Sequence, residues 1–196
     1  MDRGPAPRAE RRRLTHVDRS GRPRMVDVSD KPATVRRAVA EAFVALSAET
    51  LSMVIDGGSS KGDVLGVAEL AGVMGGKQTS DLIPLCHPIA LTDLVVTVTP
   101  DRAAGGLRVR AEAATVGPTG VEVEALTAVS IAALTIYDMV KGVERGVEIQ
   151  GVHLVSKSGG RTGEWRRPPD GQARPASFVE ARRPGIRSAG RIHKKG

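Results

Sequence analysis

The chain has 196 residues, of which 40% are hydrophobic and 26% are charged, so it is long enough for one domain with a sizeable core, and wholesale disorder is excluded. Only 2% of the residues are aromatic, which argues against recognition of nucleic acids by base stacking. The net charge of +7 comes from two Arg-rich ends, residues 1–13 and 166–196, which we interpret as disordered tails. The domain between them, residues 14–165, is net acidic, unlike a protein whose main task is to bind nucleic acid.

The segment after the first tail is predicted to form a strand and a short helix. Residues 14–28 have the character of extended chain. Residues 34–46 fit either a helix or an alternating strand. We favour a strand because Ser47 has the character of a helix N-cap and therefore starts a new element. The helix that follows ends after Ile55, where a pair of glycines closes it.

A second helix and a hairpin come next. The helix opens at Asp63, whose carboxylate can cap the free amide groups, and continues until Pro84 prevents further helical hydrogen bonding. From there the apolar residues alternate, and strands are predicted over 89–99 and over 107–117. A turn over 100–106 joins them as a hairpin.

Three glycines are unexpected inside the second predicted helix. Gly72, Gly75 and Gly76 each weaken a helix by about 1 kcal/mol relative to alanine. Either they allow close packing against another helix, or contacts between subunits mainly support this helix.

The last elements are a helix over 123–145, which is apolar nearly all round, and a strand over 147–155. The ordered part is expected to end near Trp165. Helices and hairpins in this order predict an α+β sandwich, in which helices pack on one face of a largely antiparallel sheet. Because the strands have apolar residues on both faces, we expect the open face to be buried in an oligomer.

Two glycine-rich loops carry basic residues. Lys61 comes just before the helix that opens at Asp63, where free amide groups and the helix dipole favour an anion. Lys157 and Arg161 flank a second such loop after the final strand. Each loop alone is more often a solvated turn, but two of them in a net-acidic domain favour phosphate binding.

Cys86 and His87 are adjacent in the loop between two prolines, and neighbouring side chains in extended chain point in opposite directions. We predict no metal site, because one cysteine and four dispersed histidines cannot complete a zinc ligand set. The opposite directions of the two side chains also disfavour Cys86 and His87 as a nucleophilic pair. Two interpretations remain: a buried thiol beside a hydrogen-bonding imidazole, or a histidine that donates to an anionic ligand.

The predicted helix over 123–145 has charged groups on an otherwise apolar cylinder. Asp138 and Lys141 share a face, and Glu124 lies nearly four turns earlier on a similar bearing. A carboxylate and an ammonium group on a buried face must pair, and such a pair is either structural or suited to acid–base chemistry. Glu122 and Glu124, at the entry to the helix, could cap it or face a site.

A series of motifs is spread along residues 14–165. They are Leu14-Thr15-His16-Val17, Met25-Val26-Asp27-Val28, Lys61-Gly62-Asp63-Val64, DLIPLCHP over 81–88, TGVEVEALT over 119–127, ALTIYDMVK over 133–141 and LVSKSGG over 154–160. Together they resemble the MoaC family, the cyclic pyranopterin monophosphate synthases of molybdenum-cofactor biosynthesis. The number and order of the motifs make this resemblance more specific than any single pattern above.

The resemblance implies a ferredoxin-like α+β subunit in a homohexamer, a trimer of dimers with active sites where subunits meet. The implied substrate is (8S)-3',8-cyclo-7,8-dihydroguanosine 5'-triphosphate, and the implied products are cyclic pyranopterin monophosphate and diphosphate, as for a phosphorus–oxygen lyase. Matching motif positions assign catalysis to Lys61, Asp138 and Lys141. They assign substrate contacts to Leu85, Cys86, His87, Glu122, Val123, Glu124 and Lys157, and the phosphate-loop argument adds Arg161.

The implied reaction needs proton transfers and stabilisation of phosphate charge, which carboxylate, lysine and histidine side chains supply without a redox cofactor. We expect Asp138 and the two lysines grouped with it to move protons. We expect His87, Lys157 and Arg161 to hold the triphosphate.

Two other classes of function stay open. A nucleotide sensor would use the same basic loops without the acid–base pair, and a nucleic-acid-binding protein would act through the basic tails. The single cysteine, the charged N-terminus and the lack of about 18 uninterrupted apolar residues predict a cytoplasmic protein that neither enters a membrane nor is secreted.

Overall fold

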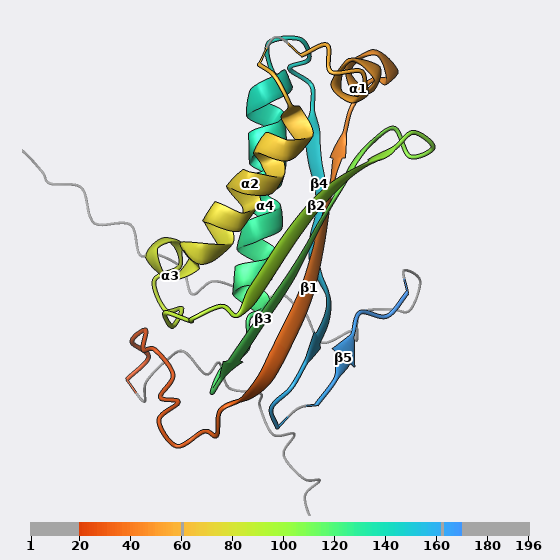
Figure 1. Ribbon diagram of the computed structural model, residues 1–196. Coiled ribbons are helices and arrows are strands. Elements are labelled where there is room, and N and C mark those ends of the chain that lie inside the picture. The colour runs from red at the N-terminus through yellow and green to blue at the C-terminus, as the bar shows by residue number, and fades with distance from the viewer. Residues whose placement is uncertain (1–19, 60, 162, 170–196) are drawn as a thin grey trace, which may run out of the picture.

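The fold was taken from a computed structural model that describes residues 20–59, 61–161 and 163–169 (Figure 1). Residues 14–19, the first tail and nearly all of the second tail lie outside the described residues, so the predictions made for them stay predictions. Residues 20–33 form no helix and no strand longer than a single bridge at Pro23.

The described strands form one antiparallel sheet in the order β2-β3-β1-β4-β5. β1 (Thr34–Ala45) pairs with β3 (Gly106–Gly117) on one side and with β4 (Glu148–Ser158) on the other. β2 (Asp93–Asp101) pairs with the outer side of β3, and the two-residue β5 (Trp165–Arg166) pairs with β4. The predicted hairpin, β2 followed by β3, is therefore confirmed.

Two long helices lie side by side on one face of this sheet (Figure 1). They are α2 (Val64–Lys77) and α4 (Glu122–Val140); the shorter α1 (Ala48–Ile55) lies at the end of β1, and α3 (Thr79–Leu82) follows α2. The α+β class with helices on one face is confirmed. Leaving out the short helices and the two-residue β5, the order β-α-β-β-α-β agrees with the ferredoxin-like arrangement.

The alternating pattern over 34–46 does form a strand. Ala38, Ala40, Ala42 and Val44 face the helices and are at most 3% exposed. Both predicted caps are present: the Ser47 side chain accepts a hydrogen bond from Thr50 N at 3.2 Å, and Asp63 accepts one from Gly66 N at 3.0 Å. These caps satisfy amide groups that a helix start leaves free.

Some predicted boundaries were wrong. The second helix does not continue to Pro84: it ends at Lys77, and Gln78 separates it from the single turn of α3. The hydroxyl of Thr79 donates to Gly76 O at 2.8 Å, which satisfies one carbonyl group at the end of α2 and fixes the break. The predicted strand over 89–99 starts only at Asp93, because the preceding residues pack against the core as irregular chain.

The C-terminal boundaries also differ from the prediction. The helix expected over 123–145 is α4 over Glu122–Val140, after which Val143 N and Glu144 N both bond to Val140 O and close a turn. The final strand continues three residues beyond the predicted end, to Ser158. By length and composition α4 could cross a membrane, but it is the central core helix of this domain, and such helices meet the same criteria.

Glycines allow α2 to lie very close to α4 and to the sheet. A Cβ atom on Gly72 would lie 2.9 Å from Val96 Cγ1 and 3.0 Å from the carbonyl oxygen of Ala128, and one on Gly75 would lie 2.8 Å from Ile131 Cβ. Real Cβ atoms essentially never approach another heavy atom to less than 3.0 Å. Close helix packing therefore explains the glycines within a single chain.

Candidate functional site

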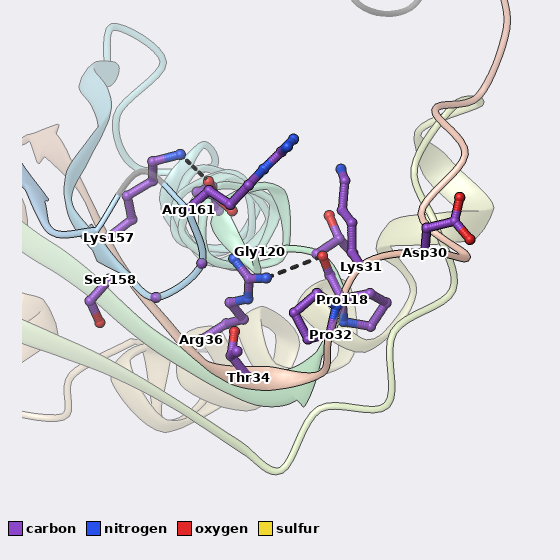
Figure 2. Close-up of a pocket in the computed structure, with 14 residues that line it drawn as sticks. Asp30, Lys31, Pro32, Thr34, Arg36, Pro118, Gly120, Lys157, Ser158 and Arg161 are labelled. Carbon is purple, nitrogen blue, oxygen red and sulfur yellow. Dashed lines mark hydrogen bonds and ion pairs between the residues drawn. The ribbon is translucent and has the colours of Figure 1, made fainter.

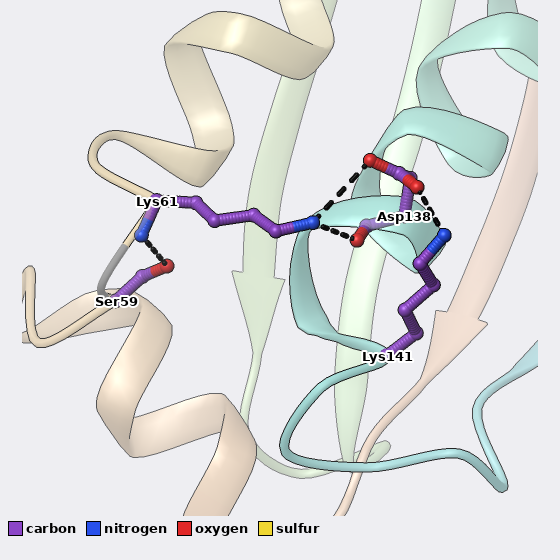
Figure 3. Close-up of polar contacts among 4 residues, drawn as sticks. All are labelled: Ser59, Lys61, Asp138 and Lys141. Atoms are coloured by element: carbon purple, nitrogen blue, oxygen red, sulfur yellow. Dashed lines mark hydrogen bonds and ion pairs between the residues drawn. The ribbon is translucent and has the colours of Figure 1, made fainter.

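A first charged cluster lies at the C-terminal end of α4. Asp138 is in the last turn of the helix, and Lys141 follows the last helical residue (Figure 3). Lys141 Nζ lies 2.6 Å from Asp138 Oδ1. Lys61, from the segment between α1 and α2, donates to the backbone oxygen of Asp138 at 2.6 Å and lies 3.4 Å from its Oδ2. The structure thus brings together the three residues predicted to be catalytic.

The pairing of Asp138 with Lys141 was predicted correctly, but the burial predicted for this pair was wrong. The side chains of Lys61, Asp138 and Lys141 are 45%, 58% and 51% exposed. Asp138 is on the same exposed side of α4 as Leu134, whereas Ile136 and Val140 on the other side are buried. The hydrogen bond from Lys141, followed by the charges of Lys141 and Lys61, lowers the pKa of Asp138, and Asp138 raises the pKa of Lys141. Because these side chains are exposed, an anion or a reacting group could reach them. Exposed ion pairs of this kind add little to the stability of the fold.

A second cluster surrounds a cavity at the N-terminal end of α4. The cavity has a volume of about 550 Å³, and basic side chains of Lys31, Arg36, Lys157 and Arg161 line it (Figure 2). Lys157 Nζ lies 2.7 Å from Glu122 Oε1 in the first turn of α4. Both basic residues of the predicted phosphate loop, Lys157 and Arg161, therefore contribute to one cavity.

An adjoining cavity of about 490 Å³ is mainly apolar. Its lining includes Leu85, Cys86, His87 and Val123, together with Glu122. Thr119, Gly120 and Glu122 line both cavities, so the two are parts of one elongated depression. One part is cationic and the other can contact a flat apolar ring.

Glu122 and Glu124 do not point the same way, because both are in the first turn of α4 and a helix rotates about 200° over two residues. Glu122 faces the cavities, whereas Glu124 is 3% exposed and accepts a hydrogen bond from Cys86 Sγ at 3.6 Å. Its other oxygen, Oε2, is buried without a hydrogen-bond partner among the described residues. Burial raises the pKa of Glu124.

Cys86 and His87 point in different directions, as predicted. The thiol faces Glu124, and burial together with the Glu124 charge raises the pKa of Cys86 to about 11. His87 Nε2 lies 2.8 Å from the backbone oxygen of Val26 in the N-terminal segment. Among the described residues, His, Cys, Asp and Glu side chains form no group of three or more that could hold a metal ion.

The eleven predicted site residues fall into two groups at opposite ends of α4. Residues 122 and 138 are separated by 16 helical steps, about 24 Å at 1.5 Å per residue. Glu124 and Asp138 share a similar bearing on α4, as the spacing indicated, but the length of the helix separates them. Within one chain, the Lys61–Asp138–Lys141 cluster does not face the cavities.

Comparison with known proteins accounts for this combination of residues. The profile of the MoaC family matches residues 25–160, which is more than half of the chain. The chain belongs to the MoaC family. Proteins named cyclic pyranopterin monophosphate synthase from three strains of Cereibacter sphaeroides are each 59% identical over 152 residues, covering 78% of this chain and 96% of theirs. The MoaC match contains every predicted site residue except Arg161, which follows it directly.

Sequence reasoning missed Arg36, which lines the larger, cationic cavity. Its guanidinium group donates to the backbone oxygens of Gly117 and Pro118 at 3.3 and 3.2 Å; Figure 2 shows the bond to Pro118. The signal was present in the alternation of β1, which places position 36 on the same side as the buried Ala38 and Ala40. A charged residue at an inward position needs partners, and that need could have identified Arg36 as a site residue.

We expect the thiol of Cys86 to resist alkylation at neutral pH. The rate of modification by iodoacetamide should rise with pH and reach half its maximum at about pH 11, since only the thiolate reacts. The Glu124→Gln variant should react faster at each pH below 11, because a charge and a hydrogen-bond partner that favour the protonated thiol are removed. Mass spectrometry reads the rate directly, since the chain has one cysteine.

Asp81→Asn is the matched control, because Asp81 is an exposed carboxylate in α3 that is not among the groups acting on Cys86. Equal alkylation profiles for the wild type and Glu124→Gln would show that Glu124 does not act on the thiol.

Proposed function

We propose that this chain is a cyclic pyranopterin monophosphate synthase, a phosphorus–oxygen lyase. It converts (8S)-3',8-cyclo-7,8-dihydroguanosine 5'-triphosphate to cyclic pyranopterin monophosphate and diphosphate, an early step of molybdenum-cofactor biosynthesis. Membership of the MoaC family and the name of its 59% identical relatives support this. The observation that supports it most directly is the cationic cavity joined to an apolar one, since the substrate joins a triphosphate to a purine-derived ring.

In this proposal the larger cavity binds the triphosphate. Lys157 and Arg161 supply positive charge from one side and Lys31 from the other, with Arg36 of β1 between them (Figure 2). Charge-assisted hydrogen bonds from these groups would also stabilise the charge that develops as diphosphate leaves. The earlier assignment of His87 to the triphosphate is changed, because His87 lines the adjoining cavity, where the ring would lie.

The proton-transfer groups in this proposal are Lys61, Asp138 and Lys141. Asp138 orients both ammonium groups, and its depressed pKa keeps it ionised between them (Figure 3). A lysine held in this way can act as a general acid toward the opening ring, and it can take a proton back later. The net reaction has no redox change, so we propose no redox cofactor.

We further propose that each active site is completed by a second subunit, within a hexamer formed as a trimer of dimers. A distance of about 24 Å along α4 is too large for Asp138 to reach a ligand in the cavities of its own chain. Exposed apolar side chains are present on the open sheet face, at Val35, Val95 and Val116, and on α2, at Leu70 and Met74. Exposed apolar side chains on both layers of the domain are consistent with subunit interfaces.

The test is turnover of the cyclic triphosphate by the purified protein, with diphosphate and pterin product followed by mass spectrometry. We expect product from the wild type and from Arg102→Ala, a control for loss of an exposed positive charge in the β2–β3 turn. Lys61→Ala and Asp138→Ala should form none above background. Tight binding without turnover by intact oligomers would refute the synthase and favour a sensor.

A second arm of the test removes residues 1–13 and 166–196. The synthase should keep its turnover, whereas a nucleic-acid-binding protein that acts through its tails would lose its binding. We propose a cytoplasmic location, because the only cysteine, Cys86, is unpaired and such thiols suit a reducing compartment.

A further inference from the structure

Glu144 joins two segments that are far apart in the sequence. It lies in the turn after α4, where its backbone N–H bonds to Val140 O at 3.0 Å. Both carboxylate oxygens lie 3.1 Å from the backbone N of Ser47, and the Ser47 hydroxyl donates to Glu144 Oε2 at 3.0 Å. The side chain therefore connects the end of α4 to the residue that caps α1.

The arrangement resembles a capping box whose acidic residue comes from another part of the chain. In an ordinary capping box, an acidic side chain in the first turn of the helix accepts from the N–H of the cap residue. That position in α1 is Thr50, which is too short to reach back, and Glu144 accepts from Ser47 instead. A negative charge at the start of a helix is also favoured by the helix dipole.

The bonds at Glu144 favour its ionised form. Partial burial opposes ionisation, but hydrogen bonds from Thr50 and Ser47 outweigh it and lower the pKa of Glu144. The carboxylate is therefore charged at neutral pH, and in this form it can accept hydrogen bonds from several donors at once.

This connection lies beside the Lys61–Asp138–Lys141 cluster. α1 leads through a short glycine-containing segment to Lys61, whose ammonium group crosses to Asp138 on α4. In Figure 1, α1 and the start of α2 lie at the same end of the molecule as the C-terminal end of α4. Thr50, Leu51 and Val54 of α1 are buried, and Met53 and Ile55 pack partly against the core, so the connection through Ser47 adds polar contacts to an apolar one.

We propose that Glu144 is a positioning residue that holds α1, and with it Lys61, in register with Asp138. The proposal rests on the proposed function in one respect, that this cluster moves protons during the reaction. Glu144 does not itself touch the reacting groups: it acts through Ser47 and the position of α1. Small displacements of a catalytic group can cost about 100-fold in rate, so the loss of this connection should be visible in turnover.

The first measurement does not depend on activity. A water-soluble carbodiimide joins a lysine to a carboxylate in contact, with loss of water, and mass spectrometry quantifies each joined pair. Lys141–Asp138 is an internal standard, because both residues are at the end of α4 and their pairing does not depend on α1. Glu144→Ala should lower the yield of Lys61–Asp138 relative to Lys141–Asp138 by about threefold or more, since displaced groups rarely meet in the required geometry.

Kinetics and matched variants complete the test. Glu144→Ala should lower kcat by about 10- to 100-fold with little change in KM, because the proposed triphosphate site is at the other end of α4. Glu144→Gln keeps one acceptor oxygen and should recover part of both losses. Glu148→Ala removes an exposed carboxylate of β4 that contacts Gln150, and it should behave as the wild type. Circular dichroism verifies that each variant is folded.

An unchanged ratio of the two cross-links in folded Glu144→Ala would overturn the proposal, whatever the kinetics show. A lower ratio with unchanged kcat would show that Glu144 positions Lys61 but that this positioning has no role in the reaction, which would also overturn it. If the wild type does not turn over the substrate, the proposed function fails, and the cross-link ratio still decides whether Glu144 holds Lys61 in place.

Discussion

Mixing two inactive variants, Asp138→Asn and Lys157→Ala, is expected to restore about one quarter of the wild-type turnover after the subunits have exchanged. Each variant alone should lose about 100-fold or more, because one lacks the carboxylate of the proton-transfer cluster and the other lacks a cation of the triphosphate cavity. If each site combines a cluster from one subunit with a cavity from its partner, a mixed pair contains one intact site and one doubly defective site. Random assembly makes about half of the pairs mixed, which gives the expected quarter.

The experiment unfolds and refolds the variants together, verifies mixed oligomers by native mass spectrometry, and measures release of diphosphate. The matched control mixes Asp138→Asn with Lys61→Ala, which are lesions in one cluster and should not complement each other. Mixed oligomers of Asp138→Asn and Lys157→Ala that stay inactive would contradict a site shared between subunits. The two ends of α4 would then need separate explanations.

Local signals in the sequence were sufficient for most of the fold. The side-chain oxygens of Ser47 and Asp63 start helices because they satisfy free amide groups, and this chemistry depends only on residues within one turn. The alternation in β1 was harder to interpret, since its inward residues are mostly alanines, which suit both helices and strands. The helix start predicted at Ser47 decided between the two in favour of a strand.

Boundaries that depend on tertiary contacts could not be predicted in the same way. Pro84 gave a firm limit for the second helix, but Gln78 interrupts it earlier, where the Thr79 hydroxyl takes the place of a helical donor. Similarly, residues 89–92 alternate like a strand, and β3 extends far enough to lie beside them, but β2 begins only at Asp93. Here the side-chain hydroxyl of Thr115 donates to Ala90 O at 2.7 Å, in place of the backbone pairing of a strand. A propensity describes what a segment can form, and pairing decides where it begins.

The candidate site residues were predicted from motifs, but their arrangement in space was not. Helical periodicity correctly paired Asp138 with Lys141, which are three residues apart. It could not show which side of this nearly all-apolar helix faces away from the core, so an exposed pair was predicted to be buried. Nor could it show that Lys157 and Asp138 lie at opposite ends of the domain, because sequence motifs contain no distances between elements.

Gly72→Ala is expected to lower the free energy of unfolding by about 1–3 kcal/mol, even though alanine is the better helix former by about 1 kcal/mol. The added methyl group would meet Val96 Cγ1 at 2.9 Å, the Ala128 carbonyl oxygen at 3.0 Å and Ala132 Cβ at 3.1 Å. Two of these neighbours belong to α4, and a backbone oxygen or a Cβ atom cannot rotate away. Relief therefore requires α2 to move outward, which opens the contact with the sheet along its length.

Urea unfolding at one protein concentration, followed by circular dichroism, measures this loss. The matched control is Gly142→Ala, since a Cβ atom there would meet nothing within 4 Å and the residue has no positive φ. Its stability should stay within about 0.5 kcal/mol of the wild type or rise slightly. A Gly72→Ala protein as stable as the wild type would show that α2 can shift without cost. The glycines would then have to be explained by contacts between subunits, as the alternative prediction from the sequence stated.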